Sequence, residues 1–427
     1  QEATPGGGFG YNYPVNVPPG TNGMGPNLSL VYNSMGGNGF MGMGWSLSGL
    51  SAITRDSSHD VNFNSTDHFV YNGQKLIPGS DGYYHTKRES FLRIEAAGLG
   101  TAAGYWVVTR KNGTKMYYGY TSADHTTADD GNIEAAGKGM PRLWALSKVE
   151  DVHGNYYVVK YLEDSSGGDY YPGRIIYTMG TGQAKFRSVR FSYETRSDHW
   201  IKYIPTGVDL DRRLKWIEVY AGTDSNGDNG SLVRKYELSY ENGASTGRSR
   251  LEWIREYGSD GVSTRPAVEF VWREGGSGFI KENLAAIPGA GWSNYRKQFT
   301  GDFNGDGKTD LALLPLEING ALRTGNVWLW KTKSPNPDLL AAIYNPSGST
   351  TTIHYKPAPQ WTGINKPVVP SNGSYPFVPN KSAVPLLLRP RSFWLPGDFR
   401  ISPNIARIAL SEQICVTNEF KTHLSRQ

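Results

Sequence analysis

The stretch "GMGPNLSLVYNSMGGNGFMGMGWSLSGLSAITR", residues 23–55, places a glycine-rich turn between two runs of alternating apolar and polar residues. The first run covers residues 28–32 and the second covers residues 45–53. Alternation with period two is typical of a half-buried β-strand, because successive side chains point to opposite faces of a sheet. The stretch therefore predicts two strands joined by a bend.

The bend itself, residues 37–42, fits the G-x-G-x-x-G pattern of a dinucleotide-binding turn. Such a turn needs a helix directly after it, because the helix N-terminus receives the pyrophosphate. Here an alternating run follows, which argues against a cofactor loop. We expect a β-arch instead, in which glycines permit the sharp bend. The apolar side chains expected to pack around it are Phe40, Met41, Met43 and Trp45.

The composition of the whole chain indicates the same class of structure. Of 427 residues, 52 are Gly, 26 are Tyr and 12 are Trp, and only 19% are charged. Gly breaks helices, whereas aromatic residues fit pleated sheets. Length suggests two or three domains. We predict an all-β protein built from antiparallel hairpins in sandwich-like or barrel-like sheets.

Turn chemistry locates several of these hairpins. Asn-Gly accommodates the positive φ values of a type I′ turn, so Asn72-Gly73 and Asn112-Gly113 are expected at hairpin tips. A third turn is expected at His153-Gly154-Asn155. Residues 1–22 read as an extended lead-in with one edge strand near residues 9–17. One short helix is expected near residues 401–409, where apolar residues recur at helical spacing.

The strongest candidate site is "GDFNGDGKTDLALL", residues 301–314. Side-chain oxygen ligands fall at positions 1, 3, 5 and 9 of a loop, and the Lys308 carbonyl falls at position 7. A Gly at position 6 allows a sharp turn. A hard cation such as Ca²⁺ needs this arrangement of oxygen ligands around a tight loop. The bidentate Glu that ends an EF-hand is absent, and a strand follows. We predict a calcium loop on a β scaffold. Its ligands are Asp302, Asn304, Asp306, Lys308 and Asp310.

A second stretch resembles this loop and then departs from it. Asp224-x-Asn226-x-Asp228 has the right oxygens, but Gly230 comes one residue late and no fourth acid follows. We predict a hairpin loop that needs no ion.

Patterns of known catalytic chemistry are missing from the sequence. The eight His fall in no H-E-x-x-H or related pattern, and neither a G-x-S-x-G elbow nor a P-loop occurs. His153 and His199 are expected in surface roles. A glycosidase pair assembled from distant strands stays open, because sequence spacing does not test it.

Charge and hydropathy limit the classes of partner that the chain is expected to bind. The net charge is +5, and residues 381–427 hold seven Lys or Arg against three acids, so the body of the chain is near neutral. It offers no basic stripe, which argues against a nucleic-acid partner. The single Cys415 forms no internal disulfide, and no apolar run is long enough to span a membrane. The start at Gln-Glu suits a mature secreted product or a trimmed chain, and we expect an extracellular location.

The stretch quoted first closely resembles the start of the SpvB-type domain, which Salmonella plasmid virulence protein B shares with the B components of insecticidal Tc toxins. The marks are the P-x-L-x-L-x-Y-x-S strand, the G-x-G-x-x-G-x-G-W turn and the Ile-Thr-Arg ending. The resemblance continues to about residue 275, and the Asp151, Gly154, Asn155 and Tyr161 pattern looks like the Rhs/YD repeat. The loop at 302–310 is similar to FG-GAP or VCBS repeats, of which relatives carry several and this chain one.

The resemblance implies a secreted, non-enzymatic β-scaffold module of a toxin complex, stabilised by calcium, that docks to other toxin-complex subunits or to a Rhs-type partner. It also implies boundaries. These are a lead-in (1–22), an SpvB-like β domain (23–290), an FG-GAP/VCBS-like calcium repeat (291–335), a Pro-rich segment with edge strands (336–379) and a divergent basic tail (380–427). One blade does not close a propeller. The repeat is therefore expected to pack on the SpvB-like domain, pair with another chain or remain marginally stable.

An alternative function is a carbohydrate-active protein, either a lectin or a polysaccharide lyase or hydrolase, with a cell-surface glycan as partner. Calcium loops on β scaffolds and exposed aromatic residues suit that class as well. A surface adhesin is a third hypothesis.

Overall fold

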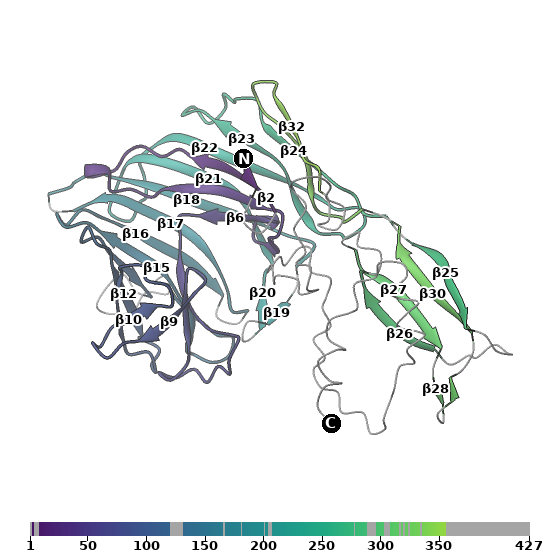
Figure 1. Ribbon diagram of the computed structural model, residues 1–427. Helices are drawn as coiled ribbons and strands as arrows, with labels where there is room; N and C mark the ends of the chain where they lie inside the picture. Colours follow the sequence, from purple (N-terminus) through teal and green to yellow (C-terminus); the bar gives the residue numbers. More distant parts are fainter. Residues whose placement is uncertain are drawn as a thin grey trace.

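The computed structural model describes residues 2–3, 8–119, 131–164, 167–180, 182–199, 201–203, 207–276, 278–287, 296–302, 308–315, 317–318, 321–322, 325–333 and 335–355. These residues form β-strands and one short 3₁₀ turn, η1 (Thr21–Gly23), so the predicted all-β class is confirmed (Figure 1). The helix expected near residues 401–409 and the tail 380–427 lie outside the described residues.

Eight strands close into a small barrel, in which each strand pairs with the next and the last pairs with the first. They are β7 (Ala52–Arg55), β8 (Phe69–Tyr71), β9 (Gln74–Pro78), β10 (Tyr84–Thr86), β11 (Arg93–Ala97), β12 (Tyr105–Thr109), β13 (Lys115–Tyr118) and β15 (Pro141–Glu150). The barrel is filled by side chains, as expected for eight strands. The rings of Phe69, Trp106 and Trp144 meet edge to face, with centroids 5.0, 5.6 and 5.9 Å apart.

Strand β15 also begins a long curved sheet, called the main sheet below. Residues 143–145 of β15 pair with β7, residues 141–144 pair with β14 (Asn132–Glu134), and residues 148–150 pair with β16. The main sheet continues through β16 (Tyr156–Asp164), β17 (Asp169–Met179), β18 (Phe186–Thr195), β21 (Arg212–Thr223), β22 (Ser231–Asn242), β23 (Ser249–Tyr257), β24 (Val268–Trp272), β31 (Leu340–Tyr344) and β32 (Thr350–Thr352). A separate pair, β19 (Ile201–Tyr203) and β20 (Gly207–Asp209), lies in the β18–β21 connection.

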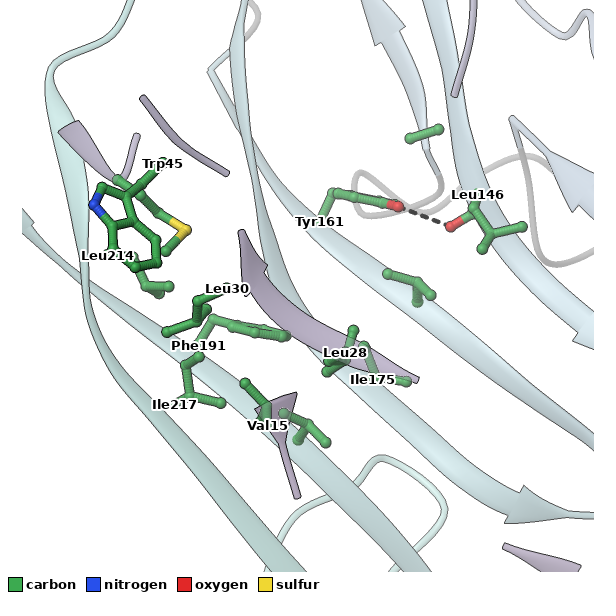
Figure 2. Packing of buried hydrophobic residues seen from close by; sticks show 14 of the residues in the cluster. Val15, Leu28, Leu30, Trp45, Leu146, Tyr161, Ile175, Phe191, Leu214 and Ile217 are labelled. Carbon is green, nitrogen blue, oxygen red and sulfur yellow. Dashed lines mark hydrogen bonds between the residues drawn. The ribbon is translucent and has the colours of Figure 1, made fainter. Parts of the chain in front are cut away.

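The N-terminal sheet packs on one face of the main sheet (Figure 1). Its strands, in order, are β1 (Glu2–Ala3), β2 (Phe9–Val15), β3 (Leu28–Asn33) and β6 (Trp45–Ser48). Strand β2 pairs on both sides, so the expected edge strand is internal. Figure 2 shows the core between the two sheets, in which Val15, Leu28 and Leu30 approach Phe191 and Ile217.

One five-residue hairpin loop recurs at five places in the described part of the chain. The N–H of its first residue donates to the carbonyl of the fifth, and the N–H of its fourth, a Gly with φ of 76–83°, donates to the carbonyl of the first. The loops begin at Gly79, Arg110, Asp151, Asp224 and Asn345. The predicted hairpins at 72–73, 112–113 and 153–155 are therefore confirmed. Of the two Asn-Gly pairs expected in type I′ turns, Asn72-Gly73 has both positive φ values, whereas Asn112 is the third residue of a five-residue loop and keeps a negative φ.

A four-stranded sheet, called the blade below, is inserted between β24 and β31, which pair with each other (Figure 1, green). Its order is β25 (Phe279–Ile287), β30 (Gly325–Thr332), β27 (Asp310–Pro315) and β26 (Arg296–Gly301), with a small hairpin of β28 (Glu317–Ile318) and β29 (Ala321–Leu322) at one turn. The repeat predicted at residues 291–335 thus obtains its fourth strand from β25, which precedes it. The proposed domain boundaries stay a prediction, because sheets alone do not define domains.

Candidate functional site

The predicted calcium loop connects β26 to β27. Gly301 pairs with Asp310, so residues 302–309 form the loop and its first and last predicted ligands, Asp302 and Asp310, lie at the same end of the hairpin. Asn304 and Asp306 lie outside the described residues. The backbone register agrees with the spacing that the sequence predicted for positions 1 and 9.

Asp310 is buried, with a residue exposure of 1%, and its Oδ1 accepts a hydrogen bond of 2.9 Å from the backbone N–H of Thr332 in β30. A buried carboxylate is costly unless hydrogen bonds or a cation compensate it. The Thr332 N–H supplies part of that compensation, and a carboxylate can accept more than one bond. Asp310 therefore joins β27 to β30 whether or not an ion is bound.

Lys308 also bonds to the end of β30. Its Nζ donates to the Thr332 carbonyl at 2.8 Å, and the Thr332 hydroxyl donates to the Thr309 carbonyl. Sequence reasoning used only the Lys308 carbonyl and missed this side-chain contact. Among the described residues no group of three or more His, Cys, Asp or Glu is arranged to hold a metal. With two of the five predicted ligands outside those residues, calcium binding remains a prediction.

The similar stretch at 224–228 is a hairpin loop between β21 and β22, as predicted. The Asp224 carboxylate accepts hydrogen bonds from the backbone N–H groups of Asn226 and Asp228, each at 3.0 Å, and from the Asn229 amide at 2.7 Å. These bonds, led by the Asp228 N–H, lower the pKa of Asp224. Turn chemistry therefore explains this acidic stretch without a cation.

The glycine-rich bend at 37–42 forms a miniature hairpin rather than a β-arch. Strands β4 (Asn38–Gly39) and β5 (Gly42–Met43) pair around Phe40-Met41, and the flanking strands β3 and β6 pair with each other in one sheet. The β-arch prediction was wrong because period-two alternation is the same whether the flanking strands enter one sheet or two. The expected packing is confirmed, since Met41 and Trp45 are buried. Strand β6, not a helix, follows the bend.

A charged network attaches this hairpin to the main sheet. Arg196 donates to the Gly39 carbonyl at 2.7 Å and to the Asn38 side chain at 2.6 Å. Asp198 accepts from Asn38 at 3.1 Å and from the Ser249 N–H at 2.6 Å. Burial alone would raise the pKa of Asp198, but hydrogen bonds from Arg196 and Ser249 outweigh it and hold the pKa well below its ordinary value. The motif that resembles a cofactor loop is a structural attachment.

A cleft of about 740 Å³ lies between the outer face of the N-terminal sheet and the small barrel. One wall comes from β2, β3, β6 and the residues around η1, and the other from the five-residue loop that begins at Arg110, β15 and β16. Side chains along the walls include Asn12, Met24, Asn27, Ser29, Val31, Ser48, Arg110, Thr114, Val149 and Tyr157. Arg110 is the one charged residue among those that line it. Sequence reasoning missed this cleft, because Arg110 lies far along the chain from the sheet that it faces.

The two His residues singled out from the sequence lie at turns and loop ends. The His153 backbone N–H donates to the Asp151 carboxylate at 2.8 Å within the five-residue loop that begins at Asp151. The His199 side chain is 58% exposed, and its Nδ1 lies 3.2 Å from an Asp209 oxygen. Both positions agree with the surface roles expected. No helix within the described residues has the length and apolar character needed to cross a membrane.

The described chain is thus an all-β scaffold of a closed barrel, a curved main sheet and an inserted blade. Residues 3–202 match the family model described as "SpvB: Salmonella virulence plasmid 65kDa B protein". This match supports an SpvB-type domain in that part of the chain. The matched residues lie within the longer range, to about residue 275, that the sequence resemblance predicts. No curated protein matches the chain.

Solved toxin structures share the fold. The chain is 18% identical to one in "Crystal Structure of TcdB2-TccC3-Cdc42", with a TM-score of 0.56 over 76% of this chain and 18% of that one. It is also 18% identical to one in the Photorhabdus luminescens Tc holotoxin pore, with a TM-score of 0.58 over 82% of this chain and 21% of that one. The chain therefore spans about a fifth of the length of these toxin chains. At this identity the likeness shows the fold alone.

The N-terminal domain of effector protein SpvB from Salmonella typhimurium strain LT2 was also found. It is 18% identical, with a TM-score of 0.48 over 58% of this chain and 98% of that one.

Proposed function

We propose that this chain is a non-enzymatic scaffold module of a secreted toxin complex, which contributes part of a β-rich shell and docks to other subunits. The observation that carries the proposal is the SpvB family match at residues 3–202 on a fold shared with Tc toxin chains. Those toxin chains are much longer than this chain, so a complete shell would require additional polypeptide. A Rhs-type partner of the TccC3 kind is the first subunit to test.

Co-expression tests the docking. The chain is produced with a TccC3-type polypeptide, and the mixture is analysed by size-exclusion chromatography and cross-linking mass spectrometry. A stable complex with cross-links to the main sheet is expected. Separate elution of the two polypeptides, together with an absence of cross-links, would contradict this assignment of partner.

We also propose that residues 302–310 bind Ca²⁺ and stabilise the blade. An ion that binds only the folded chain raises the free energy of unfolding, by about 2.7 kcal/mol when its concentration is 100 times its Kd. EDTA is expected to lower the melting temperature, and Asp306→Ala is expected to remove that response. Asp224→Ala is the matched control, because Asp224 is bonded within its own turn. An EDTA response unchanged in Asp306→Ala would exclude this loop as the site.

The alternative function, a carbohydrate-active enzyme, predicts turnover of a polysaccharide substrate. Reproducible release of reducing ends or unsaturated products from acidic polysaccharides by the purified chain would contradict the non-enzymatic proposal. The assay should include calcium, since a lyase of this class and a structural calcium loop are compatible.

A further inference from the structure

The outer face of the N-terminal sheet carries small polar side chains where it borders the cleft. Ser29 pairs with Ser48 across β3 and β6, and Asn12 pairs with Val31 across β2 and β3, so these side chains form one continuous patch. The opposite face of the same strands is apolar and packs on the main sheet (Figure 2). The patch is therefore set apart from the core, and it faces the barrel across the cleft.

Arg110 supplies the charge of the opposite wall. Its backbone is held in the five-residue loop that it begins, but the described part of the chain gives its guanidinium no hydrogen bond or ion pair. No acidic side chain lines the cleft. An arginine fork presents five N–H donors in a fixed geometry that suits a carboxylate. The charge and the donors of Arg110 are both available to a ligand.

The remaining polar groups of the cleft both donate and accept hydrogen bonds. Amides of Asn12 and Asn27 and hydroxyls of Ser29, Ser48, Thr114 and Tyr157 share this property. Sugar hydroxyls have the same double capacity, so they match such a surface. A volume of about 740 Å³ lies within the range of ligand sites, roughly 300–1,000 Å³.

Two other classes of ligand fit these walls less well. Nucleic acid needs several cations along its backbone, whereas this cleft has one. An extended peptide binds by joining a strand edge or by filling apolar pockets. Of the wall strands, β3 pairs on both sides and β6 lies at the edge of the sheet. The apolar groups of the lining are few, namely Met24, Val31, Val149 and the ring of Tyr157, so they do not form a row of apolar pockets.

We propose that this cleft binds an acidic saccharide, with Arg110 holding a carboxylate and the amide and hydroxyl groups holding ring hydroxyls. The inference goes beyond the scaffold function and does not require an enzymatic step, because the ligand is bound and released unchanged. It gives the barrel and the N-terminal sheet a joint role that neither has alone.

Isothermal titration of the full chain with oligogalacturonate tests the proposal. Binding is expected, and Arg110→Gln should weaken it by about 10-fold or more, since a hydrogen-bonded charge is lost. Arg110→Lys should retain part of the affinity. Arg88→Gln is the matched control, because Arg88 is an exposed barrel arginine outside the cleft. A neutral maltooligosaccharide of equal length should bind more weakly.

Three results would overturn the proposal. They are absence of oligogalacturonate binding, equal losses in Arg110→Gln and Arg88→Gln, and equal affinity for a glutamate oligomer of the same charge. The last result would assign the cleft to an acidic peptide. Both variants change exposed residues, so circular dichroism should show unchanged folding.

Discussion

Some charged residues are buried in this fold beside groups that compensate their charge. Arg55 and Asp67 form an ion pair of 2.5 Å inside the barrel, with side-chain exposures of 0% and 1%. Arg55 also donates to the Pro141 carbonyl at 2.8 Å and the Leu99 carbonyl at 3.3 Å. One arginine thus joins β7 to two other parts of the barrel. Removing either partner leaves a charge that water does not reach.

Asp67→Ala is expected to lower the free energy of unfolding by about 3–5 kcal/mol, because Arg55 would remain charged and buried without its partner. Urea denaturation followed by tryptophan fluorescence measures the change. The matched control is Glu95→Ala, which breaks the exposed Arg93–Glu95 pair and should cost about 0–1 kcal/mol. Similar losses of unfolding free energy in the two variants would contradict the claim that burial makes the Arg55–Asp67 pair more costly to break.

Asp198 makes stability depend on pH. Hydrogen bonds lower its pKa in the folded chain below the unfolded value of about 3.9, so its contribution is present above that value and is lost as the pH falls through the folded pKa. Asp198→Asn should destabilise the chain by about 2 kcal/mol near neutral pH. The difference between wild type and variant should shrink below about pH 4. Denaturation curves across the acid range measure it, and a pH-independent difference would contradict the assignment.

At the scale of single elements, the glycine hairpin shows why a close approach requires Gly. Gly42 has a φ of +76°, and a Cβ there would lie 2.5 Å from the Ser249 carbonyl oxygen. Gly37, five residues earlier, has no positive φ, and a Cβ added to it would have no heavy atom of another part of the chain within 4 Å. The same motif therefore contains one glycine that the fold needs and one that it does not.

Gly42→Ala is expected to cost about 2 kcal/mol or more, since it adds left-handed strain of about 1–2 kcal/mol to a backbone clash. Gly37→Ala should be close to neutral. Thermal unfolding of both variants distinguishes this explanation from a general need for flexible glycines, which would predict equal losses.

Element type was predictable here because alternation and Asn-Gly turns are local signals. The hairpins at 72–73 and 112–113 follow from two or three residues each. The pairing of β3 with β6 was missed, since alternation does not reveal which sheet a strand enters. The cleft and the Asp310–Thr332 bond were missed for a related reason. They join residues that are distant in sequence, and no local spacing signals such contacts.

At the scale of the whole molecule, the blade is an insertion whose two ends lie side by side. The chain leaves the main sheet after β24 and returns at β31, and these two strands are paired. The Lys333 N–H donates to the Gly278 carbonyl at 3.2 Å, and the Arg273 N–H donates to the Leu339 carbonyl at 2.8 Å. The main sheet is therefore continuous across the insertion point without any strand of the blade.

Buried charged residues stabilise the point at which the blade is inserted into the main sheet. Arg250 donates to Glu241 at 2.8 Å and also to Glu274, while Asp338 accepts from Thr246 at 3.0 Å. These residues flank the insertion and belong to the main sheet or its connections. The attachment point should consequently keep its structure when the blade is absent.

Replacing residues 279–332 with Gly-Gly should leave the rest of the chain folded, because the hydrogen-bonded ends are already adjacent and short exposed joins are well tolerated. Calorimetry should show one cooperative transition within a few degrees of the main transition of the intact chain. The EDTA response, if it comes from residues 302–310, should disappear with the deletion. Loss of cooperative unfolding would instead show that the blade stabilises the main sheet directly, and would exclude an independent insertion.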